Sequence, residues 1–210
     1  MKDSSNKGFW QRWAGSYAPF MKSSAGLYRA VCDGIRPHLD RGMDVLELAC
    51  GTGQLSFPLS DFVKSWEATD FSPAMICQAQ KTTGPAQLHF SVQDATNLTY
   101  GSNTFDVVVI SNALHIMPHP ELALAEIRRV LKPGGLLFAP TFIHGEGFRF
   151  RLRVRLMELV GFHTFYQWDR EQFLAYLGNH SFEVVEQRLL GGGLTPLCFA
   201  VARPIPKLSA

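Results

Sequence analysis

The sequence lacks any run of about 20 consecutive apolar residues, the length needed to cross a bilayer, although hydrophobic residues make up 46% of it. Charged residues account for only 18%, and the net charge of +2 is far from the basic excess of a dedicated nucleic-acid binder. The first twenty residues are polar and aromatic and have no continuous apolar core of the kind found in signal peptides. These absences predict a globular, cytoplasmic protein, and 210 residues suit one domain.

Cysteine is also scarce. The four cysteines are scattered and include no C-x-x-C pair; they are Cys32, Cys50, Cys77 and Cys198. This pattern argues against a disulfide framework and against a zinc site. We therefore expect a reducing compartment and no bound metal.

Apolar segments of two kinds alternate along the chain. Short runs at residues 44–50, 65–70, 105–110 and from 136 onward predict buried strands. Stripes of helical spacing lie between or before them, at Leu27, Val31 and Ile35 and again at Leu124, Ile127 and Leu131, the second ended by Pro133. A further helix is expected after Ser72 and Pro73. This alternation predicts an α/β fold with a mostly parallel sheet, and residues 182–187 and 194–202 predict a final antiparallel hairpin.

Two strand ends carry polar groups. Residues 47–53 (ELACGTG) follow the first strand, and Asp70 ends the second one about 17 residues after Gly53. In doubly wound sheets, ligands bind beyond the carboxyl ends of the strands, where an acid can accept hydrogen bonds from both ribose hydroxyls. Each feature alone has a simpler interpretation, such as a tight turn at the glycines.

Five segments in order resemble the motifs of class I S-adenosylmethionine-dependent methyltransferases. They are residues 45–53 (VLELACGTG), 68–75 (ATDFSPAM), 93–95 (QDA), 103–108 (NTFDVV) and 131–135 (LKPGG). Within that family the chain is similar to the type 11 group, which includes quinone-biosynthesis and phospholipid methyltransferases. The resemblance implies a Rossmann-like sheet of seven strands with helices on both faces and S-adenosylmethionine as cofactor.

The resemblance also implies roles for individual residues. Glu47, Gly51 and Gly53 would line the methionine and ribose, Asp70 the ribose, Phe71 one face of adenine, and Asp94 with Ala95 the adenine edge; Tyr17, Met75 and Ser111 complete the expected cofactor site. Local alternatives stay open: Asp94 as a loop or helix cap and Phe71 as core packing. Ala49 stands where the family usually has its first glycine, which is tolerable if the residue keeps ordinary strand angles.

A nicotinamide-dependent oxidoreductase is the nearest alternative, because it uses the same sheet and an acid after its second strand. Its fingerprint requires G-x-G-x-x-G, and here Ser56 stands in place of the third glycine. A protein that binds S-adenosylmethionine without catalysis is the second alternative.

The resemblance divides the domain into four parts. Residues 1–40 would form a helical cap, 43–140 the cofactor-binding core, 142–170 a lid insertion, and 171–204 a C-terminal helix and hairpin. The cap places aromatic residues on one helical face: Phe9, Trp13, Tyr17 and Phe20. The insertion alternates arginines with apolar residues over 148–156, which fits an anionic or lipid-like acceptor, a membrane surface or a solvated face.

Three histidines follow predicted strands or lie in the insertion: His115, His144 and His163. His115 is the candidate general base, with a role as pocket wall left open. The fourth strand ends in residues 111–114 (SNAL), without the Asn/Asp-Pro-Pro-aromatic signature of the resembling enzymes that methylate amino groups in nucleic acids. We therefore expect a small-molecule or lipid-like acceptor, and the sequence does not predict which acceptor or which oligomeric state.

Overall fold

A computed structural model describes residues 6, 8, 11–12, 25–143, 164–191 and 196–206. The predictions for Tyr17 and the other N-terminal aromatics, for the arginine-rich run at 148–156, and for His144 and His163 lie outside these residues. No helix in the described ranges is long and apolar enough to cross a membrane.

Strands and helices alternate as the sequence predicts. The strands are β1 (Asp44–Leu48), β2 (Ser65–Asp70), β3 (Leu88–Val92), β4 (Phe105–Ile110), β5 (Leu131–Phe138), β6 (Thr141–Phe142), β7 (Phe182–Leu190) and β8 (Leu197–Pro204). The α-helices are α2 (Ala25–Ile35), α3 (Ser56–Leu59), α4 (Pro73–Ala79), α5 (Pro120–Val130) and α7 (Arg170–Asn179), and three short 3-10 turns are η2 (Arg36–His38), η3 (Ser60–Phe62) and η4 (Leu114–Ile116).

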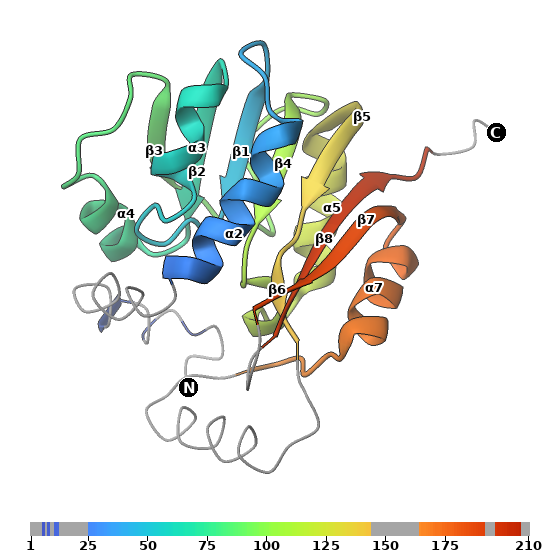
Figure 1. Ribbon diagram of the computed structural model, residues 1–210. Helices are drawn as coiled ribbons and strands as arrows, with labels where there is room; N and C mark the ends of the chain where they lie inside the picture. Colours follow the sequence, from blue (N-terminus) through green and yellow to red (C-terminus); the bar gives the residue numbers. More distant parts are fainter. Residues whose placement is uncertain are drawn as a thin grey trace.

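All strands join one sheet in the order β3-β2-β1-β4-β5-β8-β6, and β7 pairs with β8 (Figure 1). Neighbouring strands from β3 to β5 are parallel, whereas β8 is antiparallel to β5, β6 and β7. This confirms the mostly parallel sheet and its final hairpin, with β6 as one additional two-residue strand. The strand order reverses between β1 and β4, so the carboxyl ends of these strands form the switch point at which doubly wound sheets bind ligands.

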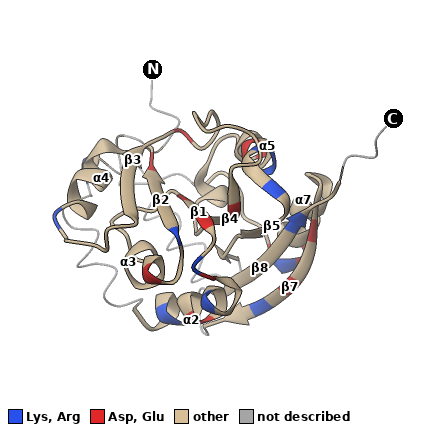
Figure 2. Ribbon diagram, turned by 90° about the horizontal axis from the view of Figure 1, so that it is seen from above, with Lys and Arg blue, Asp and Glu red and all other residues tan. Residues whose placement is uncertain are grey.

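The two faces of the sheet follow the alternation of side chains along each strand. In β1, Leu46 and Leu48 pack into the cluster that includes residues of α5 and α7. Val45 points to the opposite face and packs with residues of α2 and α3. Figure 2, seen from above, shows helices on both sides of the sheet. The expectation of a sheet covered on both faces is therefore confirmed.

One boundary differs from the sequence prediction. The sequence predicts a helical stripe that continues through Leu131 to Pro133, but α5 ends at Val130 and Leu131 already belongs to β5. Pro133 disfavours helical angles in the residue before it, Lys132, and the chain leaves the helix one residue earlier, at Leu131, which has extended angles (φ −68°, ψ 134°). The chain therefore passes from α5 to β5 with no separate loop, and the register between β4 and β5 shifts between Phe105 and Val107.

Candidate functional site

A pocket opens at the carboxyl ends of β1, β2, β3 and β4. Its wall includes the loops that follow these strands and the segment from η4 to the start of α5. The predicted cofactor residues that line it are Gly51, Asp70, Phe71, Met75, Asp94, Ala95 and Ser111. Residues up to 60 positions apart in the sequence therefore meet at the switch point of the sheet.

Asp70 is the central acid of this pocket. Its side chain is buried, with the residue only 5% exposed, and its Oδ2 accepts a hydrogen bond from the amide of Gly51 at 3.0 Å. Oδ1 accepts from the amide of Ser72 at 2.9 Å. Burial raises the pKa of Asp70, against the lowering effect of these two hydrogen bonds. Since an ionised carboxylate has about four acceptor sites, both oxygens can still accept a ligand hydroxyl.

The helix after Asp70 begins as predicted. Ser72 caps α4 by accepting a hydrogen bond from the amide of Met75 (3.4 Å), and Pro73 occupies the first turn. Met75 is buried and lines the pocket. Phe71 is partly exposed and also lines it, which favours a ligand-facing role over core packing. The short β2–α4 turn thus fixes an acid, a ring and a thioether at one pocket wall.

Asp94 lies in the turn after β3. Its Oδ1 accepts hydrogen bonds from both the amide (2.9 Å) and the hydroxyl (2.7 Å) of Thr96, so the local capping role that the sequence left open is present. Asp94 lines the pocket as well, and within the described residues its Oδ2 accepts no hydrogen bond. The turn therefore orients the carboxylate and leaves one oxygen available to a donor in the pocket.

Ala49 does not keep ordinary strand angles. Its φ is +54°, in the left-handed region where an L residue with a Cβ costs about 1–2 kcal/mol. The chain must turn sharply here, because the next amide, of Cys50, donates to the carbonyl of Thr69 at 2.9 Å. Ala49 lines the pocket, so this strain is located in the site itself, as strained residues often are.

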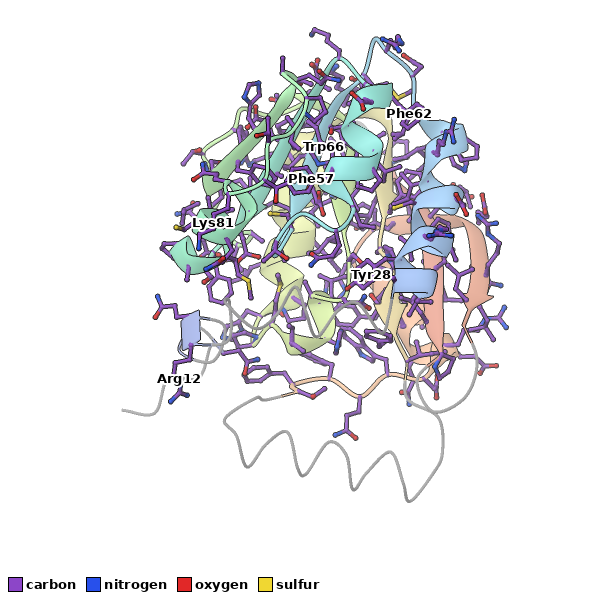
Figure 3. All side chains as sticks on the ribbon, turned by 60° about the vertical axis from the view of Figure 1, so that its left-hand side comes forward. Arg12, Tyr28, Phe57, Phe62, Trp66 and Lys81 are labelled. Carbon is purple, nitrogen blue, oxygen red and sulfur yellow. The ribbon has the colours of Figure 1, made fainter. Side chains whose placement is uncertain are left out.

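Gly53 does not line the pocket. It has a φ of +87°, and a Cβ at this position would lie 2.6 Å from Cε2 of Phe57. Phe57, which is labelled in Figure 3, in turn contacts the ring of Phe90, with centroids 5.6 Å apart. The structure thus gives Gly53 a packing role, and the predicted role at the cofactor stays a prediction.

Glu47 lies outside the pocket lining and points to the α2/α3 face of the sheet. It is 2% exposed; its Oε2 accepts hydrogen bonds from the hydroxyl of Ser56 (2.5 Å) and from Nε1 of Trp66 (2.9 Å). Burial raises the pKa of Glu47 to about 7, in spite of these bonds, and Asp70 adds to the increase. Ser56 stands in place of the third glycine of a dinucleotide fingerprint. Its hydroxyl therefore binds the buried carboxyl group of Glu47, beneath the glycine loop that follows β1.

His115 lies in η4 and is buried, at 8% exposure. Its carbonyl accepts hydrogen bonds from the amides of Phe165 (3.1 Å) and Tyr166 (3.0 Å). The next residue, Ile116, lines the pocket, whereas His115 does not. Its role as a base remains a prediction.

Asn112 is a pocket residue that the sequence did not single out. It has a φ of +53°, its amide donates to the carbonyl of Pro140 (2.8 Å), and its Oδ1 accepts from the amide of Phe142 (3.0 Å). It thereby fixes the end of β4 against β6 inside the pocket wall. An asparagine two residues after the end of an apolar strand was the available signal, since asparagine tolerates left-handed angles.

Comparison with known proteins agrees with this geometry. Residues 46–139 match the family model of a methyltransferase domain. Demethylmenaquinone methyltransferase of Renibacterium salmoninarum is 42% identical over 103 residues, which cover 49% of this chain and 43% of that protein. A ubiquinone/menaquinone biosynthesis C-methyltransferase of Cereibacter sphaeroides is 36% identical over 129 residues, 57% of this chain and 51% of that protein. The match thus spans about half the length of these relatives or less.

A solved structure extends the likeness to most of the fold. It is the complex between the Haloferax volcanii Trm112 methyltransferase activator and a putative methyltransferase; the matching chain has a TM-score of 0.78 at 19% identity, with 94% of this chain and 98% of that chain covered. The motif segments, their meeting point at the sheet and the match over residues 46–139 agree. Over residues 46–139 the chain is thus similar to a methyltransferase domain, and its fold is similar to that of the solved methyltransferase chain.

Proposed function

We propose that this protein transfers the methyl group of S-adenosylmethionine to a small, lipid-like acceptor of the quinol class. The observation that carries the cofactor part is the convergence of Asp70, Phe71 and Asp94 on one pocket at the switch point. The acceptor class is supported by the two quinone-biosynthesis relatives.

The residues present fit this cofactor. The Asp70 carboxylate, which binds two backbone amides, retains acceptor sites for ribose hydroxyls. Phe71 and Met75 offer an apolar wall for adenine, and the oriented Asp94 carboxylate can accept a hydrogen bond from the adenine amino group. When bound, the cofactor supplies an electrophilic methyl group on a sulfonium.

The chain contributes mainly orientation. Methyl transfer of this kind disperses positive charge, so much of the rate enhancement can come from holding the acceptor in line. An activated carbon or thiolate acceptor needs no strong base, whereas a hydroxyl usually does. For a hydroxyl acceptor we propose His115 as the base.

We also propose that the cap (1–40) and the insertion (142–170) cover the acceptor together. Two contacts of described residues support this. Asn6 is 3% exposed and donates from Nδ2 to the carbonyl of Ile116 at 3.0 Å; Phe165 and Tyr166 bind the carbonyl of His115. Residues of both segments are thus bound to η4, next to the pocket.

The test is turnover with methyl-labelled S-adenosylmethionine and a panel of quinols, thiols, amines and phospholipids. We expect label in a quinol product. Cofactor binding without turnover on any acceptor would favour the non-catalytic alternative. Thermal stabilisation by NAD or NADP and not by S-adenosylmethionine would favour the oxidoreductase and refute the proposal.

A further inference from the structure

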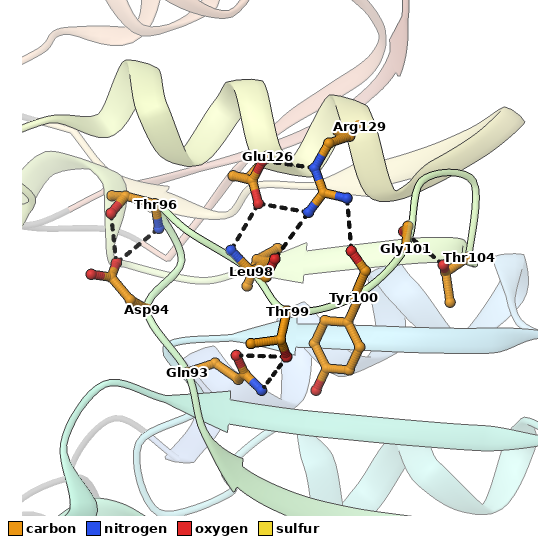
Figure 4. Close-up of polar contacts among 10 residues, drawn as sticks. All are labelled: Gln93, Asp94, Thr96, Leu98, Thr99, Tyr100, Gly101, Thr104, Glu126 and Arg129. Carbon is orange, nitrogen blue, oxygen red and sulfur yellow. Dashed lines mark hydrogen bonds and ion pairs between the residues drawn. The ribbon is translucent and has the colours of Figure 1, made fainter.

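An ion pair on α5 holds the loop that connects β3 to β4. Glu126 and Arg129 lie three residues apart on this helix. The guanidinium donates from Nε to Oε1 of Glu126 at 2.8 Å and from Nη2 to Oε2 at 2.7 Å. This is a two-point contact with fixed geometry, as Figure 4 shows.

The same pair binds three backbone groups of the loop. Arg129 donates from Nη1 to the carbonyl of Tyr100 at 2.7 Å and from Nη2 to the carbonyl of Leu98 at 3.1 Å. The amide of Leu98 donates to Oε2 of Glu126 at 2.8 Å. Leu98 is also buried in the core cluster shared with α5. One backbone amide and two backbone carbonyls of the loop are therefore hydrogen-bonded to side chains of α5.

These contacts continue to the pocket through the loop. The side chains of Gln93 and Thr99 bond to each other, with Nε2 donating to Oγ1 at 3.0 Å, which closes the loop around the residues between them. Inside it, the two bonds from Thr96 orient the carboxylate of Asp94. Asp94, Ala95 and Thr96 line the pocket, two to four residues before the anchored Leu98.

We propose that Glu126 and Arg129 are positioning residues, which hold the segment 94–96 in the conformation that receives the adenine of the cofactor. This inference rests on the proposed function of the pocket. Ordering a loop before binding removes the entropic cost of ordering it during binding. The pair therefore contributes to cofactor affinity although neither residue lines the pocket.

The chemistry of the pair fits positioning better than stability. The Arg129 and Glu126 side chains are 33% and 19% exposed, and surface ion pairs typically add little to the free energy of unfolding. A lysine could not replace the arginine, because only the planar guanidinium can bind both carboxylate oxygens and two carbonyls at once. The hydrogen bond from Arg129 lowers the pKa of Glu126, so the pair stays ionised at neutral pH.

Lys132 provides a matched control. Its Nζ lies 2.7 Å from Oδ2 of Asp106, and its side chain is 34% exposed, close to the value for Arg129. This pair lies at the amino ends of the strands, opposite the pocket. Arg129→Met and Lys132→Met therefore remove similar surface charges, but only the first frees the β3–β4 loop.

The experiment measures S-adenosylhomocysteine affinity by calorimetry and amide hydrogen exchange in the ligand-free proteins. We expect Arg129→Met to weaken binding roughly tenfold and to speed exchange in residues 94–100. Lys132→Met should keep affinity within about twofold of the wild type. Arg129→Lys should resemble Arg129→Met, because its single ammonium cannot hold both carbonyls.

The outcomes are distinguishable. Wild-type protein that binds no S-adenosylhomocysteine would refute the proposed function. Wild-type binding with unchanged affinity in Arg129→Met, or an equal loss in Lys132→Met, would overturn the positioning role alone. If Arg129→Met does not fold, Glu126→Gln provides the same comparison, since it removes the charge and one acceptor oxygen with little change in volume.

Discussion

Oδ2 of Asp70 accepts a hydrogen bond from the amide of Gly51 at 3.0 Å. This contact joins the end of β2 to the loop after β1, 19 residues earlier in the chain. A carboxylate that would bind the ribose is therefore also the residue that shapes the glycine loop. We therefore expect Asp70 to couple the conformation of this loop to the affinity for the cofactor.

Asp70→Ala is expected to weaken S-adenosylmethionine binding by about 1.5–3 kcal/mol, the range for hydrogen bonds to a charged group. Calorimetry measures this, with a thermal melt to establish that the variant folds. Asp44→Ala, which removes an acid at the amino end of β1 that binds Lys64, serves as the control and should bind normally. Unchanged affinity in folded Asp70→Ala would remove Asp70 from the cofactor site.

Glu47 should make stability depend on pH. Its folded-state pKa of about 7 exceeds its ordinary value of 4.5, so the folded protein keeps a proton that the unfolded chain loses. The stabilisation is complete below about pH 4.5 and is lost as pH rises through 7. Denaturant unfolding at several pH values should show a loss on the order of 3 kcal/mol that is missing in Glu47→Gln. The same dependence of unfolding free energy on pH in the wild type and in Glu47→Gln would assign the effect to other titratable groups.

Ala49→Gly should stabilise the protein by about 1 kcal/mol, because glycine adopts the observed φ of +54° without the Cβ penalty. Chemical denaturation measures the change. Ala68→Gly is the matched control: this buried residue of β2 has no left-handed angle to relieve, so we expect destabilisation. A destabilised Ala49→Gly would mean that the methyl contributes more by packing than it costs in strain.

Two glycines with left-handed angles allow the cost of backbone strain to be measured separately from the cost of overpacking. Gly134 has a φ of +80°, and a Cβ added there would have no atom within 4 Å, whereas a Cβ on Gly53 would meet Phe57. Gly134→Ala should cost about 1 kcal/mol from backbone strain alone, and Gly53→Ala about 1–3 kcal/mol more from overpacking. The unfolding free energies test this, and equal losses would show that the Phe57 ring moves aside freely.

Removal of residues 1–20 should reduce turnover by orders of magnitude if the N-terminal segment covers the acceptor, since closure excludes water and aligns the reactants. The circular dichroism spectrum should remain that of a folded sheet, because the core clusters of the described part of the chain are built from residues 27 onward. Steady-state kinetics with the acceptor found in the panel is the measurement. Full activity in the truncated protein would mean that the N-terminal segment has only a packing role and does not cover the acceptor.

The sequence by itself determined the layered fold and named most of the predicted cofactor residues that line one pocket. Apolar runs placed β2 and β4 at their observed bounds, and Ser72-Pro73 marked the start of α4, because strand burial and helix caps depend on local residue types. Parallel strands bring their carboxyl ends to one edge, so the position of Asp70 alone placed it at the ligand-binding edge. Asp94 was assigned only through the resemblance, because no strand is predicted from the sequence at β3 (Leu88–Val92).

Only the tertiary structure decided the direction and partners of several side chains. Glu47 turns to the α2/α3 face because side chains alternate along β1, and it then meets Ser56 and Trp66. The left-handed angle of Ala49 depends on a backbone bond to β2. The hydrogen bonds from Arg129 to the carbonyls of the β3–β4 loop join residues about 30 positions apart in the sequence. No local pattern encodes such contacts, since they arise only when separate elements pack together.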